Sequence, residues 1–389
     1  MVGRKCLPTN PEKDSTFVVT VPKFQEQTGH FDHASEVADL LAVAPYELDK
    51  GQKGPVFDRI TQGLTRHHAA NCTEYANMLR LLKFDADEEH ALEDVPFLPA
   101  RLFKLLDLKS VAPDAVHRVL TSSGTGGQPS RISLDAPTAA LQTRVLTRIV
   151  GDFLGKSRLP MLVIDAPSTI RDRTRFNARA AGIMGFSMFG RNITYALNDD
   201  MSLDVDGVVA FLERHGQAPF FMFGFTFMVY QHLLGAGAGR VRGLENGILI
   251  HGGGWKKLVD LAIDNEAFKQ RLKDETGLGR VHNYYGLVEQ TGSIFMECEA
   301  GHMHCSNFSD VMIRDADFQL CPNGERGLIE LVSLLPGSYP GHVLLTEDEG
   351  AVIGEDDCSC GRKGKYFQVY GRVAKAEVRG CSDAYASAS

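Results

Sequence analysis

The chain has 389 residues, a formal net charge of −8 and a 43% share of hydrophobic residues. This composition is that of a folded globular protein, and the negative charge argues against a nucleic-acid binder, which would normally show a basic patch. No apolar run is long enough to cross a bilayer, and residues 1–16 lack a signal peptide's apolar stretch, so we expect the eight cysteines to be reduced in a cytoplasmic protein.

Residues 1–105 are expected to be mainly helical, because apolar residues recur there at three- and four-residue spacings. In residues 106–307, short apolar runs bounded by turn residues alternate with helical stretches. That pattern is typical of an α/β core with mixed or parallel sheets, which we expect to bind a nucleotide. Residues 308–372 are rich in strands and predict a small β lobe, and residues 373–389 form a short tail that carries Cys381.

The segment RVLTSSGTGGQPSRISL, residues 118–134, places three glycines and several hydroxyl side chains directly after a short apolar strand. Glycines allow backbone N–H groups to turn toward an anion, and hydroxyls add further donors. The segment is no Walker A loop, because no Gly-Lys-Ser/Thr follows. It indicates a phosphate-binding loop, although a plain hairpin between two strands would use the same turn residues. The candidate ligands are Ser122, Ser123, Gly124, Thr125 and Gly126.

Two later segments carry candidate nucleotide ligands. In VHNYYGLVEQTGSIFMEC, Tyr285 offers a ring that can stack on a purine, Gly286 permits close approach, and Glu289 is a candidate ligand of Mg²⁺. Further along, Asp348 can accept hydrogen bonds from ribose hydroxyls, and Arg372 can bond the same sugar or a phosphate. Taken singly, these residues are explained as well by a common turn, an exposed acidic turn and a solvated arginine.

Together and in this order, the three segments resemble the adenylate-forming superfamily of acyl-CoA synthetases, luciferases and peptide-synthetase adenylation domains. With DVPFLPARLFK, HGGGWKK and the tail VRGCSD, the chain is similar to the LuxE-type acyl-protein synthetases. These are the fatty-acid-activating components of bacterial bioluminescence, and the family also has non-luminous members. The resemblance covers residues 94–383 and implies the superfamily's large N-terminal-type domain, with the C-terminal domain reduced to a short tail.

The resemblance implies that the protein uses ATP and Mg²⁺ to convert a carboxylic acid into acyl-AMP. The hydroxyl and glycine residues of the first segment would hold the phosphates. Tyr285 would stack on adenine, with Gly253 of the HGGG loop lining the other side of the ring. Glu289 would bind Mg²⁺, and Asp348 together with Arg372 would fix the ribose.

Three departures from the superfamily's pattern concern the site. Pro129 is followed by Ser130 where a lysine is usual, and Val288 stands where a threonine usually precedes the glutamate. The sequence ends 17 residues after Arg372, too few for the C-terminal domain that carries a catalytic lysine. The candidates for a replacement are Lys257, Lys375 and Lys256, of which we select Lys256, unless the enzyme does without one.

The resemblance also gives Cys381 a role. The family passes its acyl group to a cysteine near the C-terminus, and RGCSD matches that position. The thiolate is the nucleophile, and the nearby Arg379 would favour it. The resulting thioester would keep the carboxyl group activated for a partner acyltransferase or reductase. The alternative is an incidental, solvent-exposed cysteine.

Two clusters of cysteine and histidine, in MECEAGHMHC and in DDCSCGRKG, lie about fifty residues apart. Zinc prefers four tetrahedral sulfur or nitrogen ligands, although the Cys-Ser-Cys spacing is tighter than the usual one. Some aryl-CoA ligases similar to this chain carry cysteines and a histidine at corresponding places. The predicted ligands of a structural Zn²⁺ are Cys298, His304, Cys358 and Cys360. The alternative is a set of reduced cysteines packed in the β lobe.

The leading hypothesis is an ATP-dependent ligase that loads an acyl group onto its own Cys381 and passes it to a partner enzyme. A second is a ligase that joins the activated acid to coenzyme A, a carrier-protein thiol or an amine. A third is an inactive relative that binds nucleotide or scaffolds a reductase complex, which the missing lysine and Val288 favour. The acid is fatty or aryl, and the aromatic residues 219–230 form either its channel or a core strand.

Overall fold

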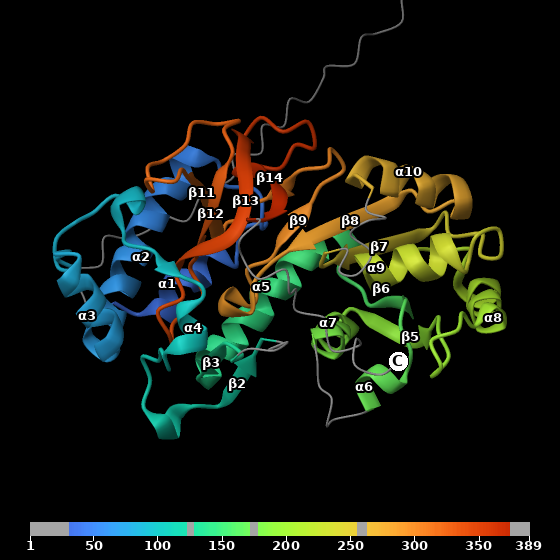
Figure 1. The fold of residues 1–389 in the computed structure, drawn as a ribbon, viewed down its shortest axis with the longest axis horizontal. Coiled ribbons are helices and arrows are strands. Elements are labelled where there is room, and N and C mark those ends of the chain that lie inside the picture. Colours follow the sequence, from blue (N-terminus) through green and yellow to red (C-terminus); the bar gives the residue numbers. More distant parts are fainter. Residues whose placement is uncertain (1–30, 123–127, 172–177, 255–262, 374–389) are drawn as a thin grey trace, which may run out of the picture. The chain divides into compact units, whose positions relative to one another are not determined.

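A twelve-stranded sheet runs through the part of the chain that this computed structural model describes, residues 31–122, 128–171, 178–254 and 263–373 (Figure 1). Contacts divide the chain after Phe31, and the sheet belongs to the unit that begins at Asp32. The strands are hydrogen-bonded in the order β11-β12-β13-β14-β10-β9-β8-β7-β6-β4-β5, with β1 on β13. The α/β class with mixed and parallel strands that the sequence predicts is confirmed.

One half of the sheet is parallel and consists of β5, β4, β6, β7 and β8 in that spatial order. Its strands are β4 (Leu159–Val163), β5 (Gly190–Tyr195), β6 (Phe220–Phe225), β7 (Gly247–Gly252) and β8 (Arg280–Tyr285). Every residue of β6 and β7 is buried, as is expected of parallel strands covered on both faces. The aromatic segment 219–230 therefore supplies a central core strand and the short helix that follows it.

The other half is antiparallel except for β1 (Leu98–Pro99), which pairs in parallel with β13. It contains the strands of the predicted β lobe, which are β11 (Ser309–Arg314), β12 (Gly327–Ser333), β13 (Val343–Glu355) and β14 (Lys365–Arg372), together with β9 (Phe295–Glu297) and β10 (Met303–His304). β10 pairs with both β9 and β14, so these strands continue the sheet of the core instead of forming a separate one. The domain boundaries at residues 105, 307 and 372 stay a prediction.

Several helices begin or end at residues with clear capping chemistry. The Asp49 side chain accepts the backbone N–H of Gln52, whose own side chain accepts the N–H of Asp49, so a capping box starts the longest described helix. Gly277, at φ 84°, ends another helix in the left-handed conformation. The α-helices are α1 (His33–Leu40), α2 (Lys50–Asn71), α3 (Thr73–Leu81), α4 (Leu102–Leu105), α5 (Ala136–Leu154), α6 (Ser168–Arg171), α7 (Ala178–Ser187), α8 (Val205–His215), α9 (Thr226–Val229) and α10 (Asn265–Thr276).

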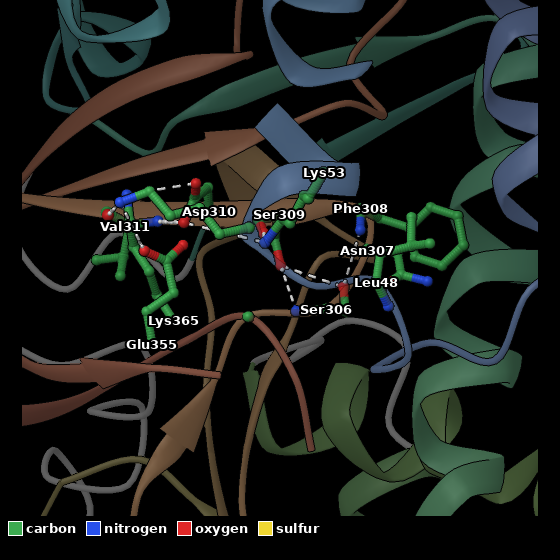
Figure 2. Close-up of polar contacts among 12 residues, drawn as sticks. Leu48, Lys53, Ser306, Asn307, Phe308, Ser309, Asp310, Val311, Glu355 and Lys365 are labelled. Carbon is green, nitrogen blue, oxygen red and sulfur yellow. Dashed lines mark hydrogen bonds and ion pairs between the residues drawn. The ribbon is translucent and has the colours of Figure 1, made fainter. Parts of the chain in front are cut away.

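Helix α2 is attached to the antiparallel half by a buried charge cluster, shown in Figure 2. Lys53 Nζ lies 3.9 Å from Asp310 Oδ1, and Lys365 Nζ lies 3.4 Å from Asp310 Oδ2. Lys53 also donates to the carbonyl of Ser309 at 2.7 Å, and Lys365 donates to that of Val311 at 3.1 Å. Burial alone would raise the pKa of Asp310, but the two lysines outweigh it and hold that pKa below its usual value.

Replacing Asp310 by asparagine is expected to lower the free energy of unfolding by about 3 kcal/mol, because it leaves two buried ammonium groups without their shared carboxylate. Urea unfolding followed by circular dichroism measures the change. The matched control is Asp317→Asn, which removes an exposed carboxylate from the turn after β11 and should change stability by less than about 0.5 kcal/mol. Equal stabilities of the two variants would contradict the importance of the cluster.

Candidate functional site

The predicted phosphate loop connects the two strands of a separate hairpin, β2 (Arg118–Thr121) and β3 (Arg131–Leu134). Two hydrogen bonds close its base: Ser130 N–H donates to Ser122 Oγ at 2.8 Å, and Ser122 N–H donates to the Ser130 carbonyl at 3.2 Å. The residues on both sides of the loop therefore form a hairpin, as the alternative interpretation of this segment expects. The candidate phosphate ligands Ser123, Gly124, Thr125 and Gly126 lie outside the described residues. Phosphate binding by this loop stays a prediction.

Glu289 lies in a 3₁₀ turn, Val288–Gln290, and is only 7% exposed. Burial raises the pKa of Glu289, while the neighbouring Ser130 side chain and the positive charges of Lys104 and Arg372 act in the opposite direction. Ser130 is itself fully buried, its hydroxyl has no hydrogen-bond partner among the described residues, and it occupies the position where the superfamily usually has a lysine. The base of the predicted phosphate loop therefore lies near the predicted magnesium ligand.

Tyr285, Asp348 and Arg372 meet at the junction of the two halves of the sheet. The Tyr285 hydroxyl donates to Asp348 Oδ2 at 2.7 Å, and Arg372 Nε lies 3.7 Å from Asp348 Oδ1. Asp348 and Arg372 are paired residues of the neighbouring strands β13 and β14. Burial and the adjacent Asp348 carboxylate raise the pKa of Tyr285, so its hydroxyl stays a donor. A carboxylate can accept about four hydrogen bonds, so Asp348 keeps capacity for ribose hydroxyls.

The glycine loop follows β7 and lies against aromatic rings. A side chain at Gly252 would meet the Tyr284 ring at 2.4 Å, and one at Gly253 would meet Phe225 at 2.9 Å. Gly253 also has φ +77°, a conformation that residues with side chains rarely adopt. Both positions therefore favour glycine; Gly252 is buried, and Gly253 is exposed. Gly286, at the end of β8, is exposed and follows Tyr285 directly in the sequence.

Two predicted catalytic residues lie outside the described part of the chain. They are Lys256, the selected replacement for the missing lysine, and Cys381, the predicted acyl acceptor; Lys257 and Lys375 also lie outside it. Their roles stay predictions. The residues that the structure does bring together are Tyr285, Glu289, Asp348 and Arg372, since the charge of Arg372 acts on Glu289 while its side chain lies beside Asp348.

The four predicted zinc ligands converge. One donor atom each from Cys298, His304, Cys358 and Cys360 lies within 4.8 Å of all the others. Cys298 Sγ is 3.9 Å from Cys358 Sγ, and Cys360 Sγ is 3.3 Å from His304 Nε2. A tetrahedral Zn²⁺ with Zn–S bonds of about 2.3 Å would separate its ligands by roughly these distances. The donor set and its spacing therefore fit a closed zinc site.

Two turns present the three cysteines, and His304 lies on β10. Cys298 begins the turn between β9 and β10, in which Gly301 donates its N–H to the Cys298 carbonyl at 3.0 Å. Cys358 begins the matching turn between β13 and β14, in which Gly361 donates to the Cys358 carbonyl at 2.9 Å. Both glycines have positive φ, of 81° and 84°. Burial raises the pKa of the Cys298 thiol to about 12, a cost that a bound cation would remove.

Sequence reasoning gave no separate role to Lys104 or Thr346, although each lies in a segment that matches a family motif. Lys104 ends the segment DVPFLPARLFK, and its charge lowers the pKa of Glu289 from a helix far away in the chain. Thr346 directly precedes Glu347 and Asp348 in the segment that matches the ribose motif. Its Oγ1 accepts the backbone N–H of Asp348 at 3.1 Å and donates to the Ile329 carbonyl at 2.9 Å, which fixes the strand that carries Asp348.

A family model and curated relatives place similar proteins in the same family of ligases. The model of a family described as acyl-protein synthetase, LuxE, matches residues 27–388. The long-chain-fatty-acid–luciferin-component ligase of Vibrio harveyi is 24% identical over 375 residues, which is 90% of this chain and 92% of that protein. The protein of the same name from Aliivibrio fischeri is 23% identical over 337 residues, 82% of this chain and 85% of its own.

Among solved structures, 2-hydroxyisobutyryl-CoA ligase in an open conformation, in complex with its acyl-AMP and CoA, has a similar fold, with a TM-score of 0.66 and 16% sequence identity. The likeness covers 84% of this chain and 71% of that one. At this identity it shows a shared fold alone, which is the fold that the sequence motifs predict. In the described part of the chain, no helix has the length and apolar character that crossing a membrane requires.

Proposed function

Because the chain belongs to the LuxE family of acyl-protein synthetases, we propose that it activates a carboxylic acid with ATP and transfers the acyl group to its own Cys381. The acid class that we assign is fatty, since the similar ligases from Vibrio harveyi and Aliivibrio fischeri are named for long-chain fatty acids. The protein is thus an AMP-forming acid–thiol ligase. Its thioester would serve a partner acyltransferase or reductase.

One observation carries the adenylation step. Tyr285, Asp348 and Arg372 are in direct contact, and the buried Glu289 lies within reach of the charge of Arg372 and near Ser130 at the base of the β2–β3 hairpin. This grouping of residues suited to adenine, ribose, Mg²⁺ and phosphate supports adenylation at this place.

In the first step, a carboxylate oxygen of the acid attacks the α-phosphorus of ATP. A new carbon–oxygen–phosphorus linkage forms, the bond to the β-phosphate breaks, and its electron pair leaves with pyrophosphate. Tyr285, held by Asp348, would position the adenine, and Asp348 with Arg372 would orient the ribose. A Mg²⁺ ion bound at Glu289 would neutralise the charge that moves onto the departing phosphates.

In the second step, the Cys381 thiol loses its proton to solvent, the thiolate attacks the acyl carbon, and the bond to AMP breaks with its electron pair on the AMP oxygen. Arg379, two residues before it, would favour the thiolate. The reaction needs a reduced Cys381, which agrees with the cytoplasmic location expected from the sequence.

The test of the proposal is the reaction of the wild-type protein with ATP, Mg²⁺ and a panel of fatty and aryl acids. Acid-dependent release of AMP and pyrophosphate, with a protein mass increased by one acyl group, is expected by intact-protein mass spectrometry. Hydroxylamine should remove the added mass, because it cleaves thioesters. AMP and pyrophosphate without a protein adduct would replace this proposal by a ligase for coenzyme A, a carrier-protein thiol or an amine. Neither product with any acid would favour the inactive nucleotide-binding scaffold.

We also propose that Cys298, His304, Cys358 and Cys360 hold a structural Zn²⁺. All four protein positions of a tetrahedron are filled by sulfur or nitrogen, which leaves no open position for chemistry. The ion would join the β9–β10 turn to the β13–β14 turn, two segments separated by about sixty residues. Its contribution is therefore to stability, through a cross-link of the antiparallel half of the sheet.

Metal analysis of the purified protein is expected to find about one Zn²⁺ per chain. Cys358→Ser should lose the metal and lower the free energy of unfolding by several kcal/mol, because one ligand and the cross-link disappear together. The matched control is Cys321→Ser, a half-buried cysteine outside the cluster, which should keep both metal and stability. A wild-type protein purified without chelator that contains no zinc would overturn the proposal.

A further inference from the structure

Lys104 is brought to the proposed adenylation site by strand pairing. It lies in α4, directly after β1, whose Leu98 and Pro99 pair in parallel with residues of β13. Ala100 N–H extends this pairing with a hydrogen bond of 2.9 Å to the Leu345 carbonyl. Thr346 and Asp348 follow within three residues on the same strand. The start of α4 is thereby fixed beside the segment that carries the proposed ribose ligand.

The core fixes α4 from its other side. Phe103, next to Lys104, is 1% exposed and belongs to a buried cluster with Ile132 and Leu134 of β3. Its ring meets the Tyr339 ring edge-on, with 5.9 Å between the centroids. The strand β3 begins immediately after Ser130, at the base of the predicted phosphate loop. Lys104 is thus held between the hairpin of the predicted phosphate loop and the strand of Asp348.

The ammonium group of Lys104 has no partner among the described residues. The lysine is half-buried, and its ammonium group forms no ion pair or side-chain hydrogen bond with any of these residues. The partly or fully buried Lys53, Lys109 and Lys365, in contrast, each have a carboxylate within 4.0 Å. A half-buried ammonium without an adjacent anion, beside a predicted phosphate site, is suited to an anionic ligand.

We propose that Lys104 is a catalytic residue of adenylation, whose ammonium group binds the β- and γ-phosphate oxygens of ATP and the departing pyrophosphate. This inference rests on the proposed function and names a further residue of the same site. It also accounts for one departure from the superfamily, since Ser130 stands where that loop usually carries a lysine. The cation is supplied instead from α4, a different part of the chain.

In the adenylation step, one bond forms as another breaks, and Lys104 gains or loses no proton. While the acid oxygen bonds to the α-phosphorus, the bond between the α-phosphorus and the bridging oxygen breaks, and the electron pair stays on pyrophosphate. Lys104 stabilises that growing negative charge as a hydrogen-bond donor and remains protonated throughout. No proton is transferred to or from it. The ammonium group therefore accelerates both adenylation and its reversal by pyrophosphate.

The experiment compares wild type with Lys104→Met, Lys104→Arg and the control Lys109→Ala. Lys104→Met keeps the apolar stem and removes the charge, and Lys109 pairs with exposed Asp107 on the same segment. The measured quantities are acid-dependent pyrophosphate–ATP exchange, the KM values for pyrophosphate and acid, and the melting temperature. Lys104→Met should lower the exchange rate at least about 100-fold and raise the KM for pyrophosphate, with an unchanged KM for the acid. Lys104→Arg should recover part of the rate.

The possible outcomes distinguish a failure of the proposed role of Lys104 from a failure of the proposed function. Exchange in Lys104→Met within about twofold of wild type would overturn the role of Lys104 and leave the proposed function intact. A rate loss that Lys104→Arg does not relieve, with an unchanged KM for pyrophosphate and a lower melting temperature, would make Lys104 a structural partner of Glu289 and also overturn the role. Absence of exchange in the wild type with every acid would overturn the proposed function, and the role of Lys104 with it.

Discussion

Cys381→Ser is expected to abolish the acylated protein while adenylation continues. The serine hydroxyl has almost the same size as the thiol but is scarcely ionised near neutral pH, so it cannot replace the thiolate as a nucleophile. The acyl mass seen on wild type by intact-protein mass spectrometry should fall below detection. Acid-dependent pyrophosphate–ATP exchange should stay within about twofold, because the groups proposed for that step lie elsewhere in the chain.

The matched control is Cys321→Ser, which changes a cysteine outside both the zinc cluster and the proposed adenylation site. It should be acylated like wild type. An acyl adduct that persists in Cys381→Ser, on another residue, would show that the tail cysteine is not the acceptor. Acylation that disappears in both variants would point to a general effect on the fold instead, which the melting temperatures would reveal.

The second large effect is expected from Glu289→Gln, which should lower adenylation by about 10³-fold. Glutamine keeps the size of the side chain but removes the negative charge that the proposed Mg²⁺ ligand requires. Acid-dependent pyrophosphate–ATP exchange over a range of Mg²⁺ concentrations measures the effect, and extra Mg²⁺ should recover part of it. Glu325→Gln, at an exposed position after β11, is the control and should exchange like wild type.

Glu289 is also expected to make the rate of adenylation depend on pH. Burial raises the pKa of Glu289 above the ordinary glutamate value, and the neighbouring Ser130 side chain and the charges of Lys104 and Arg372 offset part of the rise. Metal binding needs the carboxylate, so adenylation should fall as the pH drops through this raised pKa, earlier than an exposed glutamate would allow. An acid limb of the rate profile at or below the ordinary glutamate value would contradict the assignment of Glu289 to the metal.

Much of the site was accessible from local sequence patterns. Tyr285, Glu289, Asp348 and Arg372 are each predicted from a short motif, and the structure places them in one neighbourhood. The zinc tetrad is predicted from two short segments, and its four donor atoms converge. Such patterns are readable because a turn glycine, a ring or a thiol indicates its chemistry within a few residues.

The sequence alone determined the family, the alternation of strands and helices, and the residue types of the nucleotide and metal sites. Only the tertiary structure decided that the strands of the β lobe continue the main sheet, because the pairing of β10 with β14 joins residues more than sixty positions apart. It also decided that Ser130 and Lys104 act on Glu289. No local pattern encodes these proximities. They result from the burial of Phe103, Ile132 and Leu344 in one core, and from β1–β13 pairing, which depend on the whole chain.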